Sequence, residues 1–224
     1  MTANTSELGA EVLLHHRTSS ESPYPKVLAD IYDPAYNMVI WERELNHDLY
    51  SSVEELFDKA QSLNVEGSVT PDSALSFLLE KLDGFENVNT LSLEIAELVA
   101  MFCCLFDLKR AGLRLTMLGH AMCPKFHVDR VPCRLVTTFY NSGTQWLPHN
   151  VVDRSKLGHG SGGLNDDESG IYPSSSAIRQ MKAGDVALLK GELWEGNENA
   201  GLVHRSPALK SGEKRLLLTL DFIG

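Results

Sequence analysis

The sequence has few cysteines, no run of basic residues and no long apolar stretch, and each shortage argues against a class of protein. The four cysteines, at positions 103, 104, 123 and 133, form no Cys-x-x-Cys pair, which argues against a structural zinc site of that type. We expect free thiols in a reducing compartment. The longest unbroken apolar run, residues 98–106, is far too short to span a bilayer.

Basic residues are also in the minority, with 20 lysines and arginines against 30 acidic residues and a formal net charge of −10. Nucleic acids and anionic membrane surfaces both bind basic patches, so we expect neither as a partner. The N-terminal residues show no basic segment followed by an apolar core, and we therefore expect no signal peptide and a cytoplasmic protein. Nothing in the sequence indicates the oligomeric state.

The character of the chain changes twice along its length. Residues 1–25 are polar and rich in serine and threonine, which predicts a flexible tail. Residues 26–112 are mainly helical by pattern, with one short strand over 36–44. Residues 113–224 read as roughly eight short β-branched and aromatic segments separated by turns, which favours an all-β barrel or sandwich. A glycine- and serine-rich loop over 153–176 interrupts this part and is long enough to form a lid.

The stretch "KFHVDRVPCRLVTTFY" places His127 and Asp129 two positions apart at the entrance to a predicted strand. Side chains alternate along an extended chain, so these two side chains point to the same face. With eight histidines and thirteen aspartates in 224 residues, the number of His-x-Asp triplets expected by chance is about one half. The pair is therefore weak evidence for a metal site unless a third ligand lies near it.

His204, in the predicted strand "GLVHRSP", is the candidate third ligand, and Arg215 opens the last strand eleven residues later. Two neutral imidazoles and one carboxylate bind one face of an octahedral ion and leave three positions open. With one negative charge from the ligands, Fe(II) can accept a bidentate 2-oxo acid and then O₂. The far carboxylate of such a cosubstrate needs a cation, and a guanidinium can bind it with two hydrogen bonds.

With these residues, the sequence of residues 113–224 resembles the Fe(II)- and 2-oxoglutarate-dependent dioxygenases. The family's His-x-Asp motif matches His127 and Asp129, its distal histidine matches His204, and its 2-oxoglutarate-binding arginine falls on Arg215 in "HRSPALKSGEKRLLLTLDF". The resemblance implies an α+β fold in which N-terminal helices pack on a C-terminal double-stranded β-helix, a jelly-roll or cupin-like core. It also implies a hydroxylase. The acidic balance of the chain favours a small molecule or a protein side chain over a nucleic acid as its substrate. Over its whole length the chain is similar to a bacterial family of unknown function.

One position departs from the resemblance. Many members carry a serine two residues after the arginine, where this chain has Leu217. Hydroxyl groups that could replace that serine in cosubstrate binding are those of Thr138, Tyr140, Ser206 and Thr219.

Two other interpretations stay open at this stage. A cupin-like protein could hold zinc with the same three residues, because zinc often takes three protein ligands and a water. A structural or partner-binding domain that has lost catalysis would also carry the pattern.

Overall fold

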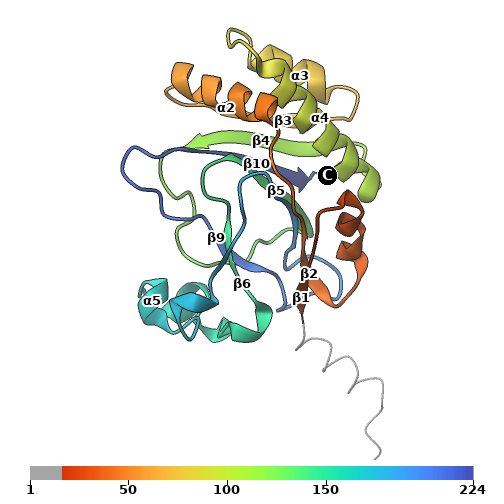
Figure 1. Cartoon of the computed structure of the whole chain (residues 1–224). Helices are drawn as coiled ribbons and strands as arrows, with labels where there is room; N and C mark the ends of the chain where they lie inside the picture. Colours follow the sequence, from red (N-terminus) through yellow and green to blue (C-terminus); the bar gives the residue numbers. More distant parts are fainter. Residues whose placement is uncertain (1–16, 224) are drawn as a thin grey trace, which may run out of the picture.

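The computed structural model describes residues 17–223, and this part of the chain forms two β-sheets with helices against the larger one (Figure 1). Within the described residues the larger sheet has seven strands in the order β1-β2-β8-β5-β10-β4-β3, and the smaller has three in the order β7-β6-β9. The large-sheet strands are β1 (Thr18–Ser22), β2 (Tyr36–Trp41), β3 (Asn64–Val69), β4 (Ala111–Leu118), β5 (Cys133–Tyr140), β8 (Val186–Lys190) and β10 (Arg215–Phe222). The small-sheet strands are β6 (Gln145–Leu147), β7 (Arg179–Gln180) and β9 (Val203–Arg205).

The helices are α2 (His47–Lys59), α3 (Ala74–Lys81), α4 (Val88–Leu105) and the short α5 (Asp166–Ser169), with a 3₁₀ helix η1 (Pro25–Tyr32) near the start. Asn46 caps α2, because its side chain accepts a 2.8 Å hydrogen bond from the Leu49 backbone N–H. Four short 3₁₀ turns lie between β6 and β7: η2 (His149–Val151), η3 (Arg154–Lys156), η4 (Gly158–Ser161) and η5 (Ser175–Ala177). The fold is thus mixed α/β with one large sheet.

Helices α2, α3 and α4 lie over one face of the large sheet (Figure 1). In α4, Leu91, Ile95, Leu98 and Phe102 recur every three or four residues and are buried in one hydrophobic cluster with Leu113 of β4. The helix is long and apolar enough to cross a membrane by length and composition alone. Its packing on the sheet explains that apolarity as the property of a core helix.

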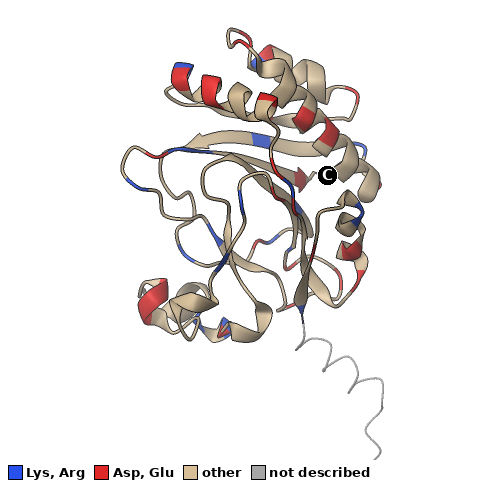
Figure 2. Ribbon diagram, viewed as in Figure 1, with Lys and Arg blue, Asp and Glu red and all other residues tan. Residues whose placement is uncertain are grey.

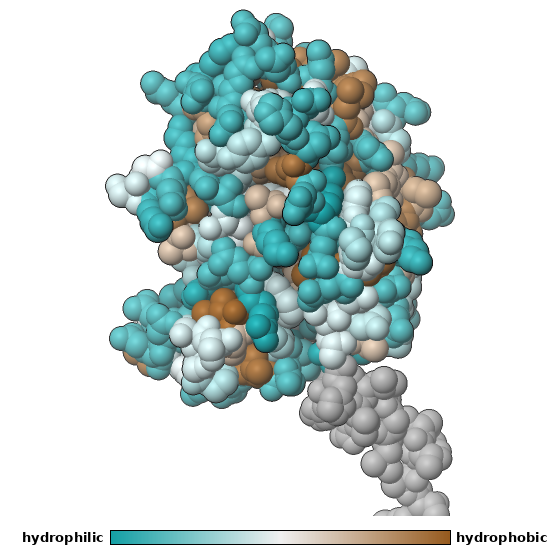
Figure 3. Space-filling model, viewed as in Figure 1, coloured by the Kyte–Doolittle hydropathy of each residue, from teal (hydrophilic) through white to brown (hydrophobic). Residues whose placement is uncertain are grey.

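The outer surface of this helical layer is acidic and mainly hydrophilic. Figure 2 shows several acidic segments along α2 and α4, whereas the sheet ribbon below them is mostly uncharged. Figure 3 shows a mainly hydrophilic surface over the helices, with small separate hydrophobic patches. Part of the excess negative charge of the chain therefore lies on the helical layer.

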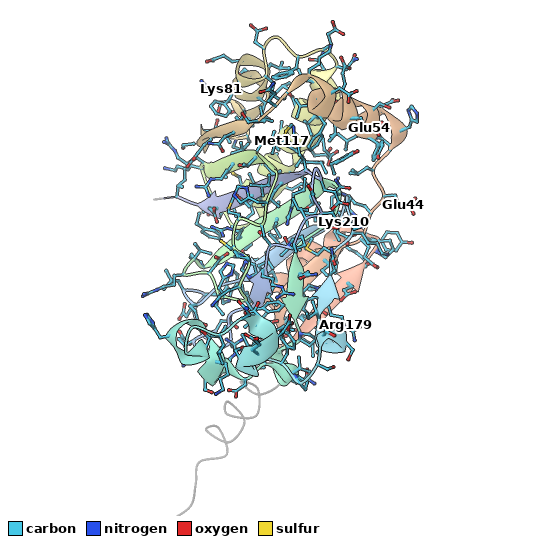
Figure 4. The ribbon with its side chains drawn as sticks, turned by 90° about the vertical axis from the view of Figure 1, so that its left-hand side faces the viewer. Glu44, Glu54, Lys81, Met117, Arg179 and Lys210 are labelled. Atoms are coloured by element: carbon cyan, nitrogen blue, oxygen red, sulfur yellow. The ribbon has the colours of Figure 1, made fainter. Side chains whose placement is uncertain are left out.

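The other face of the large sheet packs against the small sheet. A second hydrophobic cluster joins Val136 of β5, Leu189 of β8 and Leu217 of β10 to Trp146 of β6. Viewed from the side, the helical layer with Glu54 and Lys81 lies at one end, Met117 of β4 lies below it, and Arg179 of β7 lies toward the opposite end (Figure 4). The space between the two sheets is where the candidate site is found.

The structure corrects the predicted end of the long helix. The apolar helical pattern that starts at Thr90 predicts a helix with Lys109 and Arg110 in its last turn and Gly112 just after it, but α4 ends at Leu105. Asp107 adopts a left-handed conformation with φ 51°, and the Leu108 N–H donates a 2.9 Å hydrogen bond to the Cys103 carbonyl. This hydrogen bond across six residues is typical of a Schellman-type helix end. It terminates α4, and β4 begins at Ala111.

The structure also corrects the predicted flexible tail. Residues 18–22 form β1, which pairs in parallel with β2, while residues 1–16 lie outside the described residues. The sequence TSSES carries no apolar alternation, because this edge strand has no fully buried side chain. Strand β3 was likewise not predicted within the helical part of 26–112; its Gly67 lies under the Phe77 ring of α3, where a Cβ atom would be only 2.5 Å from the ring.

Lys190, at the end of β8, gives a prediction about stability. It is 2% exposed, and its Nζ donates a 2.9 Å hydrogen bond to the Asp33 carbonyl. Burial lowers the pKa of Lys190 from 10.5 to about 8. The unfolded chain therefore binds this proton more tightly, and the free energy of unfolding rises with pH between these two values. This increase in the free energy of unfolding is expected to be roughly 1–3 kcal/mol in the wild type, and Lys190→Met is expected to abolish it.

Urea unfolding on both sides of this pH range measures the effect. The matched control is Lys182→Met, because Lys182 is exposed in the turn before β8. In this control the free energy of unfolding should increase with pH as much as it does in the wild type. A rise of unchanged size in Lys190→Met would contradict the assignment.

Candidate metal centre

The segments that carry the two histidines lie side by side. His127, between β4 and β5, forms an isolated antiparallel bridge with His204 of β9. Each residue donates its backbone N–H to the other's carbonyl at 3.0 Å. The two imidazole rings consequently face each other, with ring centres 4.5 Å apart.

His127, Asp129 and His204 come together as the spacing predicted. Each offers one ligand atom, and these atoms all lie within 4.8 Å of one another. Nε2 of His127 is 3.7 Å from Oδ1 of Asp129, and Nε2 of His204 is 3.4 Å from Oδ2. Within residues 17–223 no other group of three such side chains gathers this closely. The set can hold a single divalent ion.

Both histidines are oriented through their second ring nitrogen. Nδ1 of His127 lies 2.9 Å from the Lys125 carbonyl, and Nδ1 of His204 lies 3.2 Å from the Leu202 carbonyl. A carbonyl oxygen only accepts, so we assign a proton to Nδ1 of each ring. The lone pair then lies on Nε2, the atom that faces Asp129. Hydrogen bonds of this kind are the usual support of a histidine that binds a metal.

The protonation states also fit metal binding. Burial lowers the pKa of His127, and the charge of His204 lowers it further, so His127 is neutral at pH 7. Burial raises the pKa of the Asp129 carboxyl, but the hydrogen bond and charge of His204, with the charges of Arg134 and His127, hold it at about 2. The site therefore offers a neutral His127 next to an ionised Asp129 carboxylate.

Arg134 of β5 connects Asp129 to a second carboxylate. Its Nη1 donates a 2.6 Å hydrogen bond to Oδ2 of Asp129. Its Nε and Nη2 donate to the two oxygens of Asp221 at 2.7 and 3.1 Å. Asp221 is the register partner of Arg134 across β10 and β5, so the sheet itself sets this arrangement. The ion pair holds the Asp129 carboxylate in place next to the histidines.

Arg215 is the most unusual side chain of the region, because it is 0% exposed and has no carboxylate partner among the described residues. Its Nη2 donates to the hydroxyls of Thr138 and Thr144 at 3.1 and 3.4 Å. Its Nε and Nη1 have no hydrogen-bond partner within residues 17–223. Burial lowers the pKa of Arg215 to about 10, so the group is still charged at neutral pH.

One pocket connects these parts. Its wall includes His127, His204, Arg134, Thr144 and Leu217. Since Thr144 accepts a hydrogen bond from Arg215, the buried guanidinium lies directly behind this wall. A ligand in the pocket would lie against both histidines and against Thr144, the hydrogen-bond partner of Arg215.

The other predicted cosubstrate residues divide into two groups. Ser206 lines the pocket, and Thr138 is buried against Arg215, so both lie near the candidate site. Tyr140 does not, because its ring packs on Phe57 of α2 with ring centres 4.6 Å apart. The register of β5 and β10 shifts between Leu216 and Leu217, and this bulge breaks the alternation that would turn Tyr140 toward the pocket.

Two residues of the site were not predicted as such. Asp221 could have been found, because it lies on the same face of β10 as Arg215 and Leu217 by simple alternation. Thr144 follows a turn before β6, and nothing in its local sequence marks it as a partner of Arg215.

Comparisons with known proteins place the chain in a family and give its fold. The sequence profile described as "Protein of unknown function (DUF1826)" matches residues 22–221. The chain belongs to this family. A comparison with curated proteins gave no match. Membership covers almost the whole described chain, so the helical layer and both sheets are parts of one family unit.

Among solved structures, the family member resembles a rice dioxygenase for auxin oxidation with a TM-score of 0.51 and 11% identity over 93% of this chain and 83% of that one. It is also similar to dioxygenase for auxin oxidation 1 from Arabidopsis thaliana in a 2-oxoglutarate complex (TM-score 0.48, 10% identity, 93% and 92% covered). A Pseudomonas putida prolyl-4-hydroxylase gives a TM-score of 0.44 at 12% identity, with 88% and 98% covered. The likeness to the rice enzyme shows an oxygenase-like fold, as the sequence resemblance predicted.

Proposed function

We propose that this protein is an Fe(II)- and 2-oxoglutarate-dependent dioxygenase that hydroxylates its substrate. The main support is the convergence of His127, Asp129 and His204, of which the two histidines line a pocket. Thr144 on the wall of that pocket is a hydrogen-bond partner of the buried Arg215, which has two unpartnered nitrogens. Three converging side chains alone, or a buried arginine alone, could have a purely structural role. Together they match the two needs of this chemistry, a metal with open positions and a cation for the far carboxylate of the cosubstrate.

The ligand set suits Fe(II). His127 and His204 would bind through Nε2, and Asp129 would supply the one negative charge of the set. Bound Fe(II) supplies the redox chemistry that couples O₂ and a 2-oxo acid to oxidation of a C–H bond. With only three protein ligands, such an ion would keep coordination positions open for other ligands.

Arg215 would bind the far carboxylate of 2-oxoglutarate through its unused N–H groups. A buried unpaired carboxylate is costly, and a charge-assisted hydrogen bond from a guanidinium offsets that cost. Thr138 and Thr144 hold the guanidinium by accepting hydrogen bonds from its Nη2, and Ser206 lines the same pocket as Thr144. Leu217, in the place where many dioxygenases carry a serine, offers no hydrogen bond, and the buried Thr219 hydroxyl on the pocket wall is its replacement.

We also propose that the two facing sheets form the double-stranded β-helix of these enzymes, with the site between them. The arrangement supports this in that His204 comes from the small sheet and Arg215 from the large one. The N-terminal helices would then stabilise the large sheet from its far side.

Metal content and 2-oxoglutarate turnover test the proposal together. The protein is purified without a tag or chelator, its metals are measured, and 2-oxoglutarate consumption is followed after Fe(II) is added. We expect Fe(II)-dependent consumption in the wild type and none in Asp129→Ala. Bound zinc with no consumption in the presence of Fe(II) would contradict the proposal and support a zinc-binding protein instead.

A further inference from the structure

The long loop between β6 and β7 reaches the metal site through one buried carboxylate. Asp166, the first residue of α5, is 9% exposed. Its Oδ2 accepts a 3.0 Å hydrogen bond from the backbone N–H of Phe126 and a 2.8 Å hydrogen bond from Nη1 of Arg205. Phe126 directly precedes His127, and Arg205 directly follows His204. One oxygen atom therefore connects the two segments that carry the histidines.

We propose that Asp166 is a positioning residue for the metal centre, and this inference rests on the proposed function. Asp166 belongs neither to the converging ligand set nor to the residues that line the pocket, although its partner Arg205 does line it. It acts through the backbone next to His127 and the side chain next to His204. By fixing these two neighbours, it fixes the separation and orientation of the two Nε2 atoms.

The backbone pairing between the two histidine segments is short, so a further connection between them matters. It consists of the isolated bridge of two hydrogen bonds and one more, from the Ser206 N–H to the Cys123 carbonyl at 2.9 Å, rather than a continuous ladder. Arg205 adds to the connection, since its guanidinium lies 4.3 Å from the Phe126 ring centre and its Nε donates to Gln145 at 2.8 Å. The charge of Asp166 holds Arg205 in this position.

The loop is attached by other contacts that do not involve Asp166. Lys125 Nζ donates to the Leu164 carbonyl at 2.9 Å, and the Phe126 and Tyr172 rings meet edge to face at 5.8 Å. Phe126 and Tyr172 belong to a buried cluster with Leu147, Ile171 and Val203. Substitution of Asp166 should therefore leave the loop in place, and its effect should be confined to the histidine segments.

Mn(II) affinity, measured as free Mn(II) by electron paramagnetic resonance, tests the inference in the full chain. Asp166→Ala should weaken binding by about tenfold or more, the scale on which groups that orient metal ligands act. Asp166→Asn should fall between Asp166→Ala and wild type, because its amide oxygen still accepts from Phe126 but carries no charge for Arg205. Glu168→Gln, an exposed residue of the same helix, is the matched control and should bind like wild type.

A second readout separates positioning from general stability. The Co(II) visible spectrum of Asp166→Asn should change in band position or intensity, while its circular dichroism and its melting temperature without metal stay near those of wild type. Asp166→Ala binding as tightly as wild type, or Glu168→Gln weakening binding equally, would overturn the inference alone. A wild type that binds no Mn(II) would overturn the proposed function and this inference with it.

Discussion

Asp129→Ala is expected to lower Mn(II) affinity by at least about a hundredfold, beyond the range seen when only a supporting group is lost. Asp129 is the single anionic ligand of the set, and its carboxyl, with a pKa of about 2, is charged throughout the neutral range. Without it, two neutral imidazoles face the ion beside the positive Arg134, whose only remaining carboxylate partner described is Asp221. Isothermal titration of the anaerobic protein with Mn(II) measures the loss.

The fold should survive this substitution. Asp129 lies in a connecting segment, and Arg134 keeps its two hydrogen bonds to Asp221. Asp58→Ala, on the exposed side of α2, removes the same charge far from the site and should bind Mn(II) like wild type. Equal affinity of Asp129→Ala and wild type would show that Asp129 is not a ligand.

Arg215→Leu is expected to weaken 2-oxoglutarate binding by about 2–4 kcal/mol, or roughly 30- to 900-fold, the scale of losing one partner of a buried charged pair. Mn(II) binding should stay nearly intact, since Arg215 does not belong to the ligand set. Arg215→Lys should recover part of the affinity, because an ammonium cannot make the forked contact of a guanidinium. Affinities are measured with the anaerobic Mn(II) form.

The same variant distinguishes a ligand anchor from a structural residue. Burying a charged guanidinium with two unpartnered nitrogens is unfavourable without a ligand, so ligand-free Arg215→Leu should melt no lower than wild type. Arg179→Leu, on an exposed position of β7, is the matched control for both measurements. A large fall in melting temperature with unchanged 2-oxoglutarate affinity would make Arg215 a structural residue.

The proximity of the three candidate ligands could be anticipated from the sequence, because their positions follow simple rules. His127 and Asp129 share a face through strand alternation, and His204 lies in a recognisable strand near the end of the chain. Strand alternation could not predict the direction of the Tyr140 side chain, because a bulge between β5 and β10 turns it toward α2. The bulge depends on the register between strands 75 positions apart in the sequence, from Tyr140 to Arg215, and no local pattern reports it.

The fold was predictable where side chains are buried on one regular face. The helices α2 and α4 carry apolar residues at helical spacing, and β2, β5 and β8 are rich in apolar and β-branched residues. Strands β1 and β3 were missed, since β1 is a polar edge strand and β3 contains a glycine that packs under a ring from α3. Asp166 was missed as well, because its partners come from two segments distant in the sequence.

The most direct test of the account is a titration of 2-oxoglutarate into the anaerobic wild-type protein, with and without Mn(II). We expect saturable binding of 2-oxoglutarate below millimolar concentration, and we expect it to depend on Mn(II). The proposed function requires the cosubstrate to contact both the guanidinium of Arg215 and an ion held by His127, Asp129 and His204. An absence of binding by the Mn(II)-loaded protein at millimolar 2-oxoglutarate would contradict it.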